Sequence, residues 1–145
     1  MKINKCMTRD VQLTSPTQSI REAAKTMAEI DAGMLPVGQD DRLVGMITDR
    51  DIAIRAVAEG KSPDTPVSEI MSKEVLYCFE DQELEEVARN MADIKVRRLP
   101  VLNRDKRLVG IVSLGDLSQK EQPEVTAKAM TSISKPGGKH SQAVQ

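Results

Sequence analysis

The chain contains an internal repeat, which restricts its possible folds more than any other feature of the sequence. Five apolar residues with the spacing of the buried face of an amphipathic helix recur 64 positions later. The two sets are Ile20, Ala23, Ala24, Met27, Ala28 and Leu84, Val87, Ala88, Met91, Ala92. A Leu-Pro-Val tripeptide follows each set. The segments before the two sets also match, with Ile3, Met7 and Val11 in the first copy and Val67, Met71 and Val75 in the second. The sequence therefore predicts two copies of one supersecondary unit.

Each copy is expected to consist of a short strand, a helix, two strands joined by a turn, and a second helix. In the first copy these elements are expected at residues 11–14, 20–32, 34–37, 43–48 and 49–59. Ser19 and Glu22 have the spacing of a capping box, which predicts the start of the first helix, and Gly33 is expected to end it. The polar segment 39–42 predicts a hairpin turn between the two later strands.

The repeat also predicts the domain organisation. We expect a first motif over residues 1–60, a linker over 61–66, a second motif over 67–120 and a partly disordered tail over 121–145, in which residues 124–133 could form a short helix. A motif of about 60 residues with three short strands buries too little apolar surface to be stable alone. The expected fold is therefore α/β (α+β), with the two motifs packed as a pseudo-twofold pair around a cleft.

Three sequence features occur in both copies in the same order. They are the Leu-Pro-Val strand, the Arg-Leu-Val-Gly segments at residues 42–45 and 107–110, and the strand-to-helix segments at residues 45–51 and 110–116. Together they resemble the cystathionine-β-synthase-type (CBS) domain family over roughly residues 3–119. The resemblance implies a βαββα fold for each motif. It also implies that such pairs bind AMP, ADP, ATP, NAD-type nucleotides or S-adenosylmethionine, and commonly dimerise.

A hydroxyl residue lies three positions before an aspartate in both strand-to-helix segments, Thr48 before Asp51 and Ser113 before Asp116. From the residues alone, two interpretations stay open. The pair could form a plain helix cap. Alternatively, the aspartate could accept the hydroxyls of a ribose, while the hydroxyl and the free N–H groups of the helix start meet a phosphate. Capping boxes favour the longer Glu or Gln, so the shorter aspartates could point outward instead. The resemblance to the CBS-domain family implies that they contact a ligand.

The resemblance implies two clefts. Each would join the hydroxyl residue and the aspartate of one motif to the first strand and the segment around Leu-Pro-Val of the other motif. The first cleft would comprise Thr48, Arg50, Asp51, Tyr77, Cys78, Arg97, Arg98 and Pro100. The second cleft would comprise Thr14, Met34, Pro36, Ser113 and Asp116.

The two clefts are expected to differ in their affinity for phosphate. Arg97 and Arg98 suit a phosphate because a guanidinium presents a planar fork of donors. Gly33 and Met34 stand at the equivalent positions of the first motif and offer no cation. We therefore expect the cleft that contains Thr48 and Asp51 to be the better nucleotide site.

Composition argues against several other classes of function. A net charge of −1 and an aromatic content of 1% do not suit nucleic acid, which requires positive surface and stacking faces. One histidine, His140, and two separated cysteines, Cys6 and Cys78, predict neither a metal site nor a nucleophile–histidine pair. Both thiols are expected to be buried in a protein of a reducing compartment. No apolar run approaches the roughly 20 residues that span a bilayer, so we expect no membrane contact and a cytoplasmic location.

These expectations favour a regulatory module over an enzyme. An adenine nucleotide (AMP, ADP, ATP or NAD-type) would be its regulatory ligand, no cofactor would be required, and an effector protein would respond in trans. The alternative is a ligand-independent interaction or scaffold protein. A homodimer is expected because Ala53, Ala56 and Val57 of the second helix are predicted to lack cover within the chain.

Overall fold

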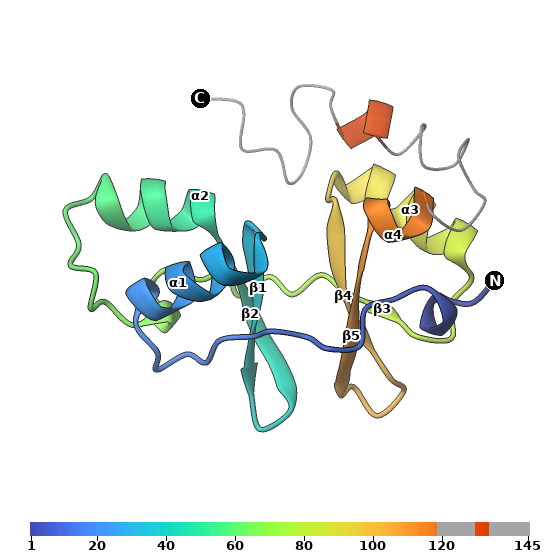
Figure 1. Cartoon of the computed structure of the whole chain (residues 1–145), viewed down its shortest axis with the longest axis horizontal. Helices are drawn as coiled ribbons and strands as arrows, with labels where there is room; N and C mark the ends of the chain where they lie inside the picture. The colour runs from blue at the N-terminus through green and yellow to red at the C-terminus, as the bar shows by residue number, and fades with distance from the viewer. Residues whose placement is uncertain (119–129, 134–145) are drawn as a thin grey trace. The chain divides into compact units, whose positions relative to one another are not determined.

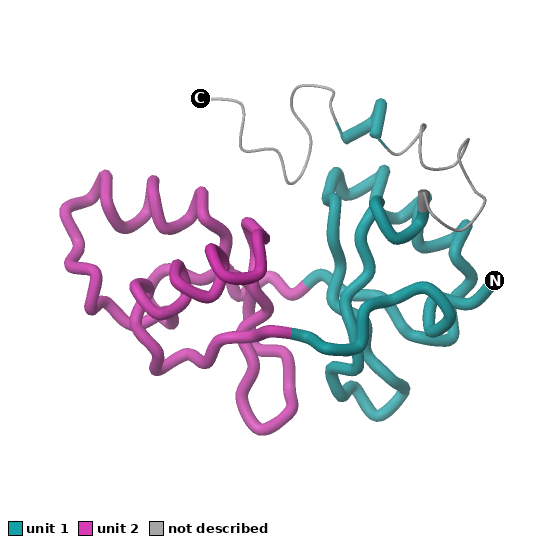
Figure 2. Tube along the Cα trace, viewed as in Figure 1, with its two compact units in different colours: residues 1–11, 76–145 teal, residues 12–75 magenta. Residues whose placement is uncertain are grey.

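The computed structural model describes residues 1–118 and 130–133, and these form two compact units (Figure 2). Unit 2 is Gln12–Val75, and unit 1 combines Met1–Val11 with the chain from Leu76 onward. Residues 130–133 are helical. The rest of the helix expected over 124–133, and the tail beyond 134, lie outside the described residues.

Unit 2 contains a helix, a two-stranded antiparallel sheet and a second helical segment (Figure 1). Its elements are α1 (Ile20–Ile30), β1 (Met34–Gln39), β2 (Arg42–Thr48), α2 (Asp49–Asp51), the π-helix η2 (Ile52–Val57) and the 3₁₀-helix η3 (Val67–Glu69). The strand expected at residues 11–14 is reduced to one parallel bridge between Thr14 and Val37. The core consists of the buried residues Ile20, Ala23, Met27, Leu35, Val37, Ile47, Ala56, Val67, Ile70 and Met71.

Helix α1 begins as the sequence predicts and ends earlier. The Glu22 amide donates to the Ser19 side chain over 3.1 Å, which caps the helix. The helix stops at Ile30 because Asp31 adopts the left-handed conformation with φ 53°, so the expectation that Gly33 ends it was wrong. Aspartate tolerates this conformation better than most residues. Of the predicted apolar stripe, Ala24 and Ala28 are exposed.

The hairpin of unit 2 is tighter than expected. Its strands extend to Gln39 and from Arg42, so only Asp40 and Asp41 form the turn. Both have positive φ, 54° and 63°, as the favoured two-residue hairpin turns require. The strand register shifts between Val37 and Gly38, where one residue is left unpaired.

The second helical segment of unit 2 differs from the regular helix expected over 49–59. After α2 it continues as the π-helix η2, in which the Ala58 amide donates to the Ala53 carbonyl and the Lys61 amide to the Ala56 carbonyl, both over 2.9 Å. These bonds span five residues instead of four and so change which side chains face inward. Ala56 is fully buried, whereas Ile54 and Val57 are 46% and 69% exposed.

Unit 1 contains a three-stranded sheet in the order β3-β4-β5, covered by helices (Figure 1). Its elements are η1 (Ile3–Lys5), β3 (Cys78–Phe79), α3 (Leu84–Ile94), β4 (Arg98–Leu102), β5 (Leu108–Ser113) and α4 (Leu114–Ser118). Strand β3 is parallel to β4, and β4 is antiparallel to β5. The buried core comprises Ile3, Cys6, Cys78, Leu84, Val87, Ala88, Met91, Leu99, Val101, Val112, Leu114 and Leu117.

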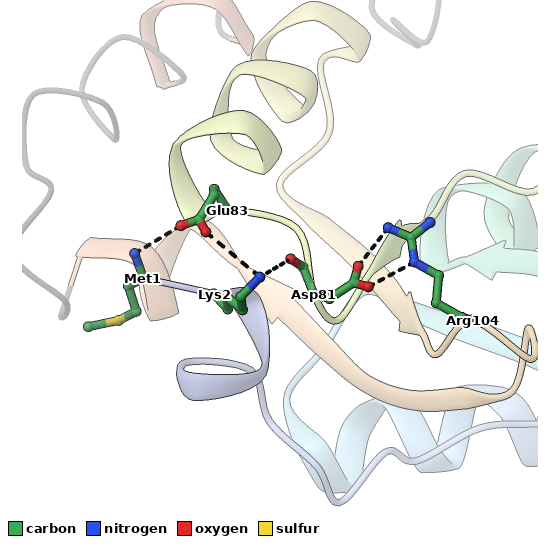
Figure 3. Close-up of polar contacts among 5 residues, drawn as sticks. All are labelled: Met1, Lys2, Asp81, Glu83 and Arg104. Carbon is green, nitrogen blue, oxygen red and sulfur yellow. Dashed lines mark hydrogen bonds and ion pairs between the residues drawn. The ribbon is translucent and has the colours of Figure 1, made fainter.

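No side chain caps helix α3, and the residues at its start are held by the polar contacts of Met1, Lys2 and Arg104 with Glu83 and Asp81 (Figure 3). The Leu84 amide donates to the Met1 carbonyl over 2.8 Å, and Lys2 Nζ donates to the Asp81 carbonyl over 3.1 Å. Arg104 forms two hydrogen bonds to the Asp81 carboxylate, at 2.7 and 2.9 Å, and lies over the Phe79 ring. The hydrogen bond from Arg104 lowers the pKa of Asp81.

The compact units and the sequence repeats divide the chain differently. We call residues 1–11 and 67–75 the leaders of the first and second motif. The first leader belongs to unit 1, where Thr8 exchanges two backbone hydrogen bonds with Ile111, of 2.8 and 2.9 Å. The second leader belongs to unit 2, where Ser72 exchanges two with Met46, of 2.8 and 2.9 Å. Each leader therefore pairs with the hairpin of the other motif.

The expected linker over 61–66 also packs within unit 2. The amide of Ile20 donates to the Thr65 carbonyl over 2.9 Å, and the amide of Arg21 to the Pro63 carbonyl over 3.1 Å. These two bonds satisfy donors at the N-terminus of α1, which has no intrahelical partners for them. The segment thus forms part of the helix start.

Candidate ligand-binding sites

The two strand-to-helix turns have the same closed geometry. Thr48 Oγ1 accepts the Asp51 amide over 2.9 Å, and Asp51 Oδ2 accepts the Thr48 amide over 3.0 Å. Ser113 Oγ accepts the Asp116 amide over 3.1 Å, and Asp116 Oδ2 accepts the Ser113 amide over 2.9 Å. Both pairs are complete capping boxes. The expectation that an aspartate would be too short for this role was wrong.

The boxes fix each aspartate and use only one of its two oxygens. Among residues 1–118 and 130–133, no hydrogen bond reaches Oδ1 of Asp51 or of Asp116. Both side chains are half-buried. A half-buried carboxylate held by a backbone donor can use its second oxygen to accept a ligand hydroxyl with little further loss of side-chain freedom. A helix cap and a ligand contact are therefore compatible functions of the same residue.

In unit 1, two arginines lie at the same end of the sheet as Ser113. Arg98 is the register partner of Ser113, and the Leu114 amide donates to the Arg97 carbonyl over 3.0 Å. Arg97 is exposed and Arg98 half-buried. Neither guanidinium forms an ion pair within the part of the chain that the structure describes. Both are thus available to an anionic ligand.

In unit 2, the equivalent positions carry different chemistry. Met34 is the register partner of Thr48, and the Asp49 amide donates to the Gly33 carbonyl over 2.9 Å. The Asp49 carboxylate lies directly against Gly33, where an added Cβ would come within 2.9 Å of Oδ2. Arg50 is exposed, while its counterpart in unit 1 is Gly115. The sequence analysis did not single out Asp49, although a second acid two positions before Asp51 was a visible signal.

The remaining candidates lie on the strands and at their starts. Thr14 is buried, and its amide donates to the Pro36 carbonyl over 3.1 Å. Pro36, Cys78 and Pro100 are buried too, so they can offer a ligand mainly backbone groups. Tyr77 is half-buried and meets Phe79 edge to face at 5.4 Å between ring centroids.

The structure thus brings the candidates together in two groups. Unit 2 holds Thr14, Met34, Pro36, Thr48, Arg50 and Asp51, and unit 1 holds Tyr77, Cys78, Arg97, Arg98, Pro100, Ser113 and Asp116. The assignment of clefts that combine residues of both units stays a prediction.

Both cysteines are buried, as the sequence predicts, and neither forms a disulfide. Burial, and to a smaller extent the neighbouring Cys6, raise the pKa of the Cys78 thiol to about 12. Within residues 1–118 and 130–133, no group of three or more His, Cys, Asp or Glu side chains could hold a metal ion. No helix in this part of the chain is both long and apolar enough to cross a bilayer.

A tandem α+β repeat with a capped hydroxyl–aspartate turn in each copy defines a class of proteins built from two copies of one small motif. The family model of the CBS domain matches the chain twice, at residues 3–57 and 67–121. The chain therefore belongs to the CBS-domain family. It is 43% identical over 129 residues to the CBS domain-containing protein YhcV of Bacillus subtilis (strain 168), covering 88% of this chain and 91% of that protein.

Three solved structures show the range of ligands in similar folds. The AMP complex of CBSX2 is 26% identical, with a TM-score of 0.71, covering 82% of this chain and 94% of that one. The CBS domain pair of MJ0100, with 5′-methylthioadenosine and S-adenosyl-L-methionine, is 31% identical with a TM-score of 0.71, covering 83% and 94%. Hypoxic Response Protein I, with two coordinated zinc ions, is 35% identical with a TM-score of 0.76, covering 84% and 100%.

Proposed function

We propose that this protein is a regulatory adenine-nucleotide sensor that catalyses no reaction and acts in trans on an effector protein in the cytoplasm. The observation that carries the proposal is the pair of fixed aspartates, Asp51 and Asp116. Each is held by a backbone donor through Oδ2 and keeps Oδ1 for a ligand. A ribose presents two adjacent hydroxyls, which suit such an acceptor.

The ligand class is supported by chemistry in the chain and by the similar structures. Arg97 and Arg98 offer guanidinium donors for a phosphate, and neither is engaged with a carboxylate of the described residues. The CBSX2 and MJ0100 structures hold AMP and adenosine-containing sulfur compounds. We therefore propose AMP, ADP, ATP or an NAD-type nucleotide as the regulatory ligand, with no cofactor required.

We assign the principal cleft to Thr48 and Asp51 of unit 2 together with Tyr77, Arg97 and Arg98 of unit 1. The second cleft would combine Ser113 and Asp116 with Thr14 and the segment at 33–36. This division follows from the CBS-domain resemblance. Within this division only the principal cleft contains the Arg97–Arg98 pair, so it should hold a phosphate more tightly than the second cleft.

We also propose a homodimer, formed through the exposed side of η2. Ile54 and Val57 are 46% and 69% exposed there, and Ala53 is exposed beside them. Apolar side chains grouped on one helical face are typical of an interface. The sequence-based prediction included Ala56, which is wrong for this residue because it is fully buried.

A scaffold without a ligand is the second candidate, and the complete capping boxes favour it. They account for Thr48, Asp51, Ser113 and Asp116 without any nucleotide. Native mass spectrometry of protein purified from cells, combined with isothermal titration against AMP, ATP, NAD and adenosine, distinguishes the two candidates. Co-purified nucleotide and saturable binding support the sensor. Their absence with all four ligands would leave the scaffold.

A further inference from the structure

The two motifs differ in the charged group that stands at one structurally equivalent position. Gly33 and Arg97 are equivalent, because each accepts the same backbone hydrogen bond from the first residue of the following helix, Asp49 or Leu114. In unit 1 the position carries the exposed guanidinium of Arg97. In unit 2 it carries no side chain of its own.

The vacant side-chain position at Gly33 is taken by the carboxylate of Asp49. A Cβ added to Gly33 would lie 2.9 Å from Asp49 Oδ2 and 3.2 Å from Oδ1. The carboxylate therefore stands where the side chain of Arg97 begins in the other motif. A negative charge in unit 2 replaces a positive charge in unit 1.

The charge of Asp49 is not needed for its local hydrogen bond. Its Oδ1 accepts the Arg50 amide over 2.8 Å, and the side-chain oxygen of an asparagine could accept the same bond. Asparagine also suits the start of a helix. What distinguishes the two side chains is the electrostatic effect of the charge on a nearby anion.

We infer that Asp49 is a specificity-determining residue that disfavours phosphorylated ligands in the cleft containing the segment at 33–36. This inference rests on the proposed function and names the ligand class of its second cleft. That cleft accepts adenosine derivatives whose 5′ substituent is uncharged or cationic, such as a thioether or a sulfonium. The cleft that contains Arg97 accepts the phosphorylated ones. One chain would then report two chemically different adenosine compounds.

The test compares AMP with 5′-methylthioadenosine, which differ in the charge of the 5′ group. Isothermal titration of the full chain gives the affinity of the second site for both ligands. In Asp49→Asn, we expect AMP to bind this site about three- to tenfold more tightly, with 5′-methylthioadenosine unchanged, because one like charge is removed in a hydrated environment. Glu59→Gln is the matched control, since it removes one exposed carboxylate of the same unit. It should leave both affinities unchanged.

A second measurement requires no substitution. Raising the salt concentration from about 0.05 to 0.5 M screens exposed charges. In the unmodified protein, the affinities of the second site for AMP and for 5′-methylthioadenosine should therefore become more similar. If both ligands bind, but the AMP to 5′-methylthioadenosine affinity ratio is the same in Asp49→Asn and Glu59→Gln and does not change with salt, the role of Asp49 is refuted and the proposed function stands. If neither ligand binds to any of the three proteins, the proposed function fails as well.

Discussion

Met71 lies so close to Gly45 that a Cβ on the glycine would come within 2.7 Å of its Sδ atom and 2.8 Å of the Ser72 carbonyl oxygen. Gly110 has the same relationship to Met7, since a Cβ on this glycine would come within 2.6 Å of the Met7 Sδ atom. These two contacts are where each leader crosses the hairpin of the other motif. They explain why a glycine follows the Leu-Val of β2 and of β5.

Gly45→Ala should therefore destabilise the protein by about 1–3 kcal/mol, because the added methyl group overpacks the contact with a backbone atom that cannot move freely. Gly115→Ala is the control, since among the described residues its Cβ would meet Ser113 Oγ alone, at an ordinary 3.5 Å. Urea unfolding followed by circular dichroism measures both. Equal midpoints for the two variants would contradict the close approach.

The repeat allowed the order of elements and the α+β class to be predicted, because periodic apolar residues determine both. The exchange of leaders could not be predicted in this way. Met7 and Met71 occupy equivalent places in equivalent segments, so either leader could pack against either hairpin on local sequence alone. The periodic pattern therefore does not distinguish the two possible pairings.

The candidate sites were also predicted only in part, and the reason differs from the one for the leaders. The hydroxyl–aspartate spacing correctly located both turns, but the reach of an aspartate in a capping box was underestimated. The hydrogen bonds of 3.0 and 2.9 Å from the Thr48 and Ser113 amides show that the shorter side chain is sufficient here. The burial of Ala56 was missed because it was grouped with the exposed Ala53 and Val57, whereas it packs into the core of unit 2 on the same side as Ile52, four residues before it.

The proposed dimer can be tested at the most exposed apolar residue of η2. Val57→Glu should produce a monomer, because a carboxylate buried in an interface without a partner is strongly unfavourable. Light scattering at micromolar concentration measures the change, with Lys73→Glu as a control for an exposed charge reversal elsewhere in unit 2. A 16.0 kDa species for the unmodified protein would already argue against the dimer.

The Cys78 thiol should react with a disulfide reagent at pH 8 only as fast as the protein opens. With its pKa raised from 9.0 to about 12 by burial, almost no thiolate exists in the folded state at that pH. Both cysteines should react at once in 6 M urea. Rapid reaction of Cys78 in the folded protein would contradict its burial.

The same shift predicts how stability depends on alkaline pH. The unfolded thiol ionises above pH 9, whereas the folded one stays neutral until about 12. The contribution of Cys78 is therefore fully present below pH 9 and is lost as the pH rises toward 12, by on the order of 1.4 kcal/mol per unit. Comparing urea midpoints of the unmodified protein and Cys78→Ala from pH 8 to 11 measures this slope, which the variant should lack.

Arg98→Ala should weaken the binding of phosphorylated ligands far more than that of adenosine, which lacks the group that a guanidinium holds. A hydrogen bond to a charged group contributes roughly 1.5–3 kcal/mol, so AMP and ATP should lose about 10- to 100-fold in affinity. Arg89→Ala, an exposed residue of α3, is the control. An equal loss for AMP and adenosine in Arg98→Ala would indicate a general structural effect instead of a phosphate contact.

The two fixed aspartates allow a binding role to be separated from a capping role within one pair of variants. Asp51→Ala and Asp116→Ala remove the same capping hydrogen bond, of 3.0 and 2.9 Å, so both should lower stability by a similar amount, about 1 kcal/mol. Their effects on the principal nucleotide site should differ. Asp51→Ala should weaken AMP or ATP binding there by about 10- to 100-fold, whereas Asp116→Ala removes an acid from the other cleft and should change it little.

Thermal unfolding without ligand and isothermal titration with AMP and ATP measure the two effects on the same samples. If Asp116→Ala abolishes tight binding while Asp51→Ala does not, the principal cleft is the one that contains Ser113. If both variants lose stability equally and neither changes affinity, the aspartates act only as helix caps. The Oδ1 atoms of the two aspartates would then accept no hydrogen bond from a ligand. The ligand-independent interaction or scaffold protein would be the better description of this chain.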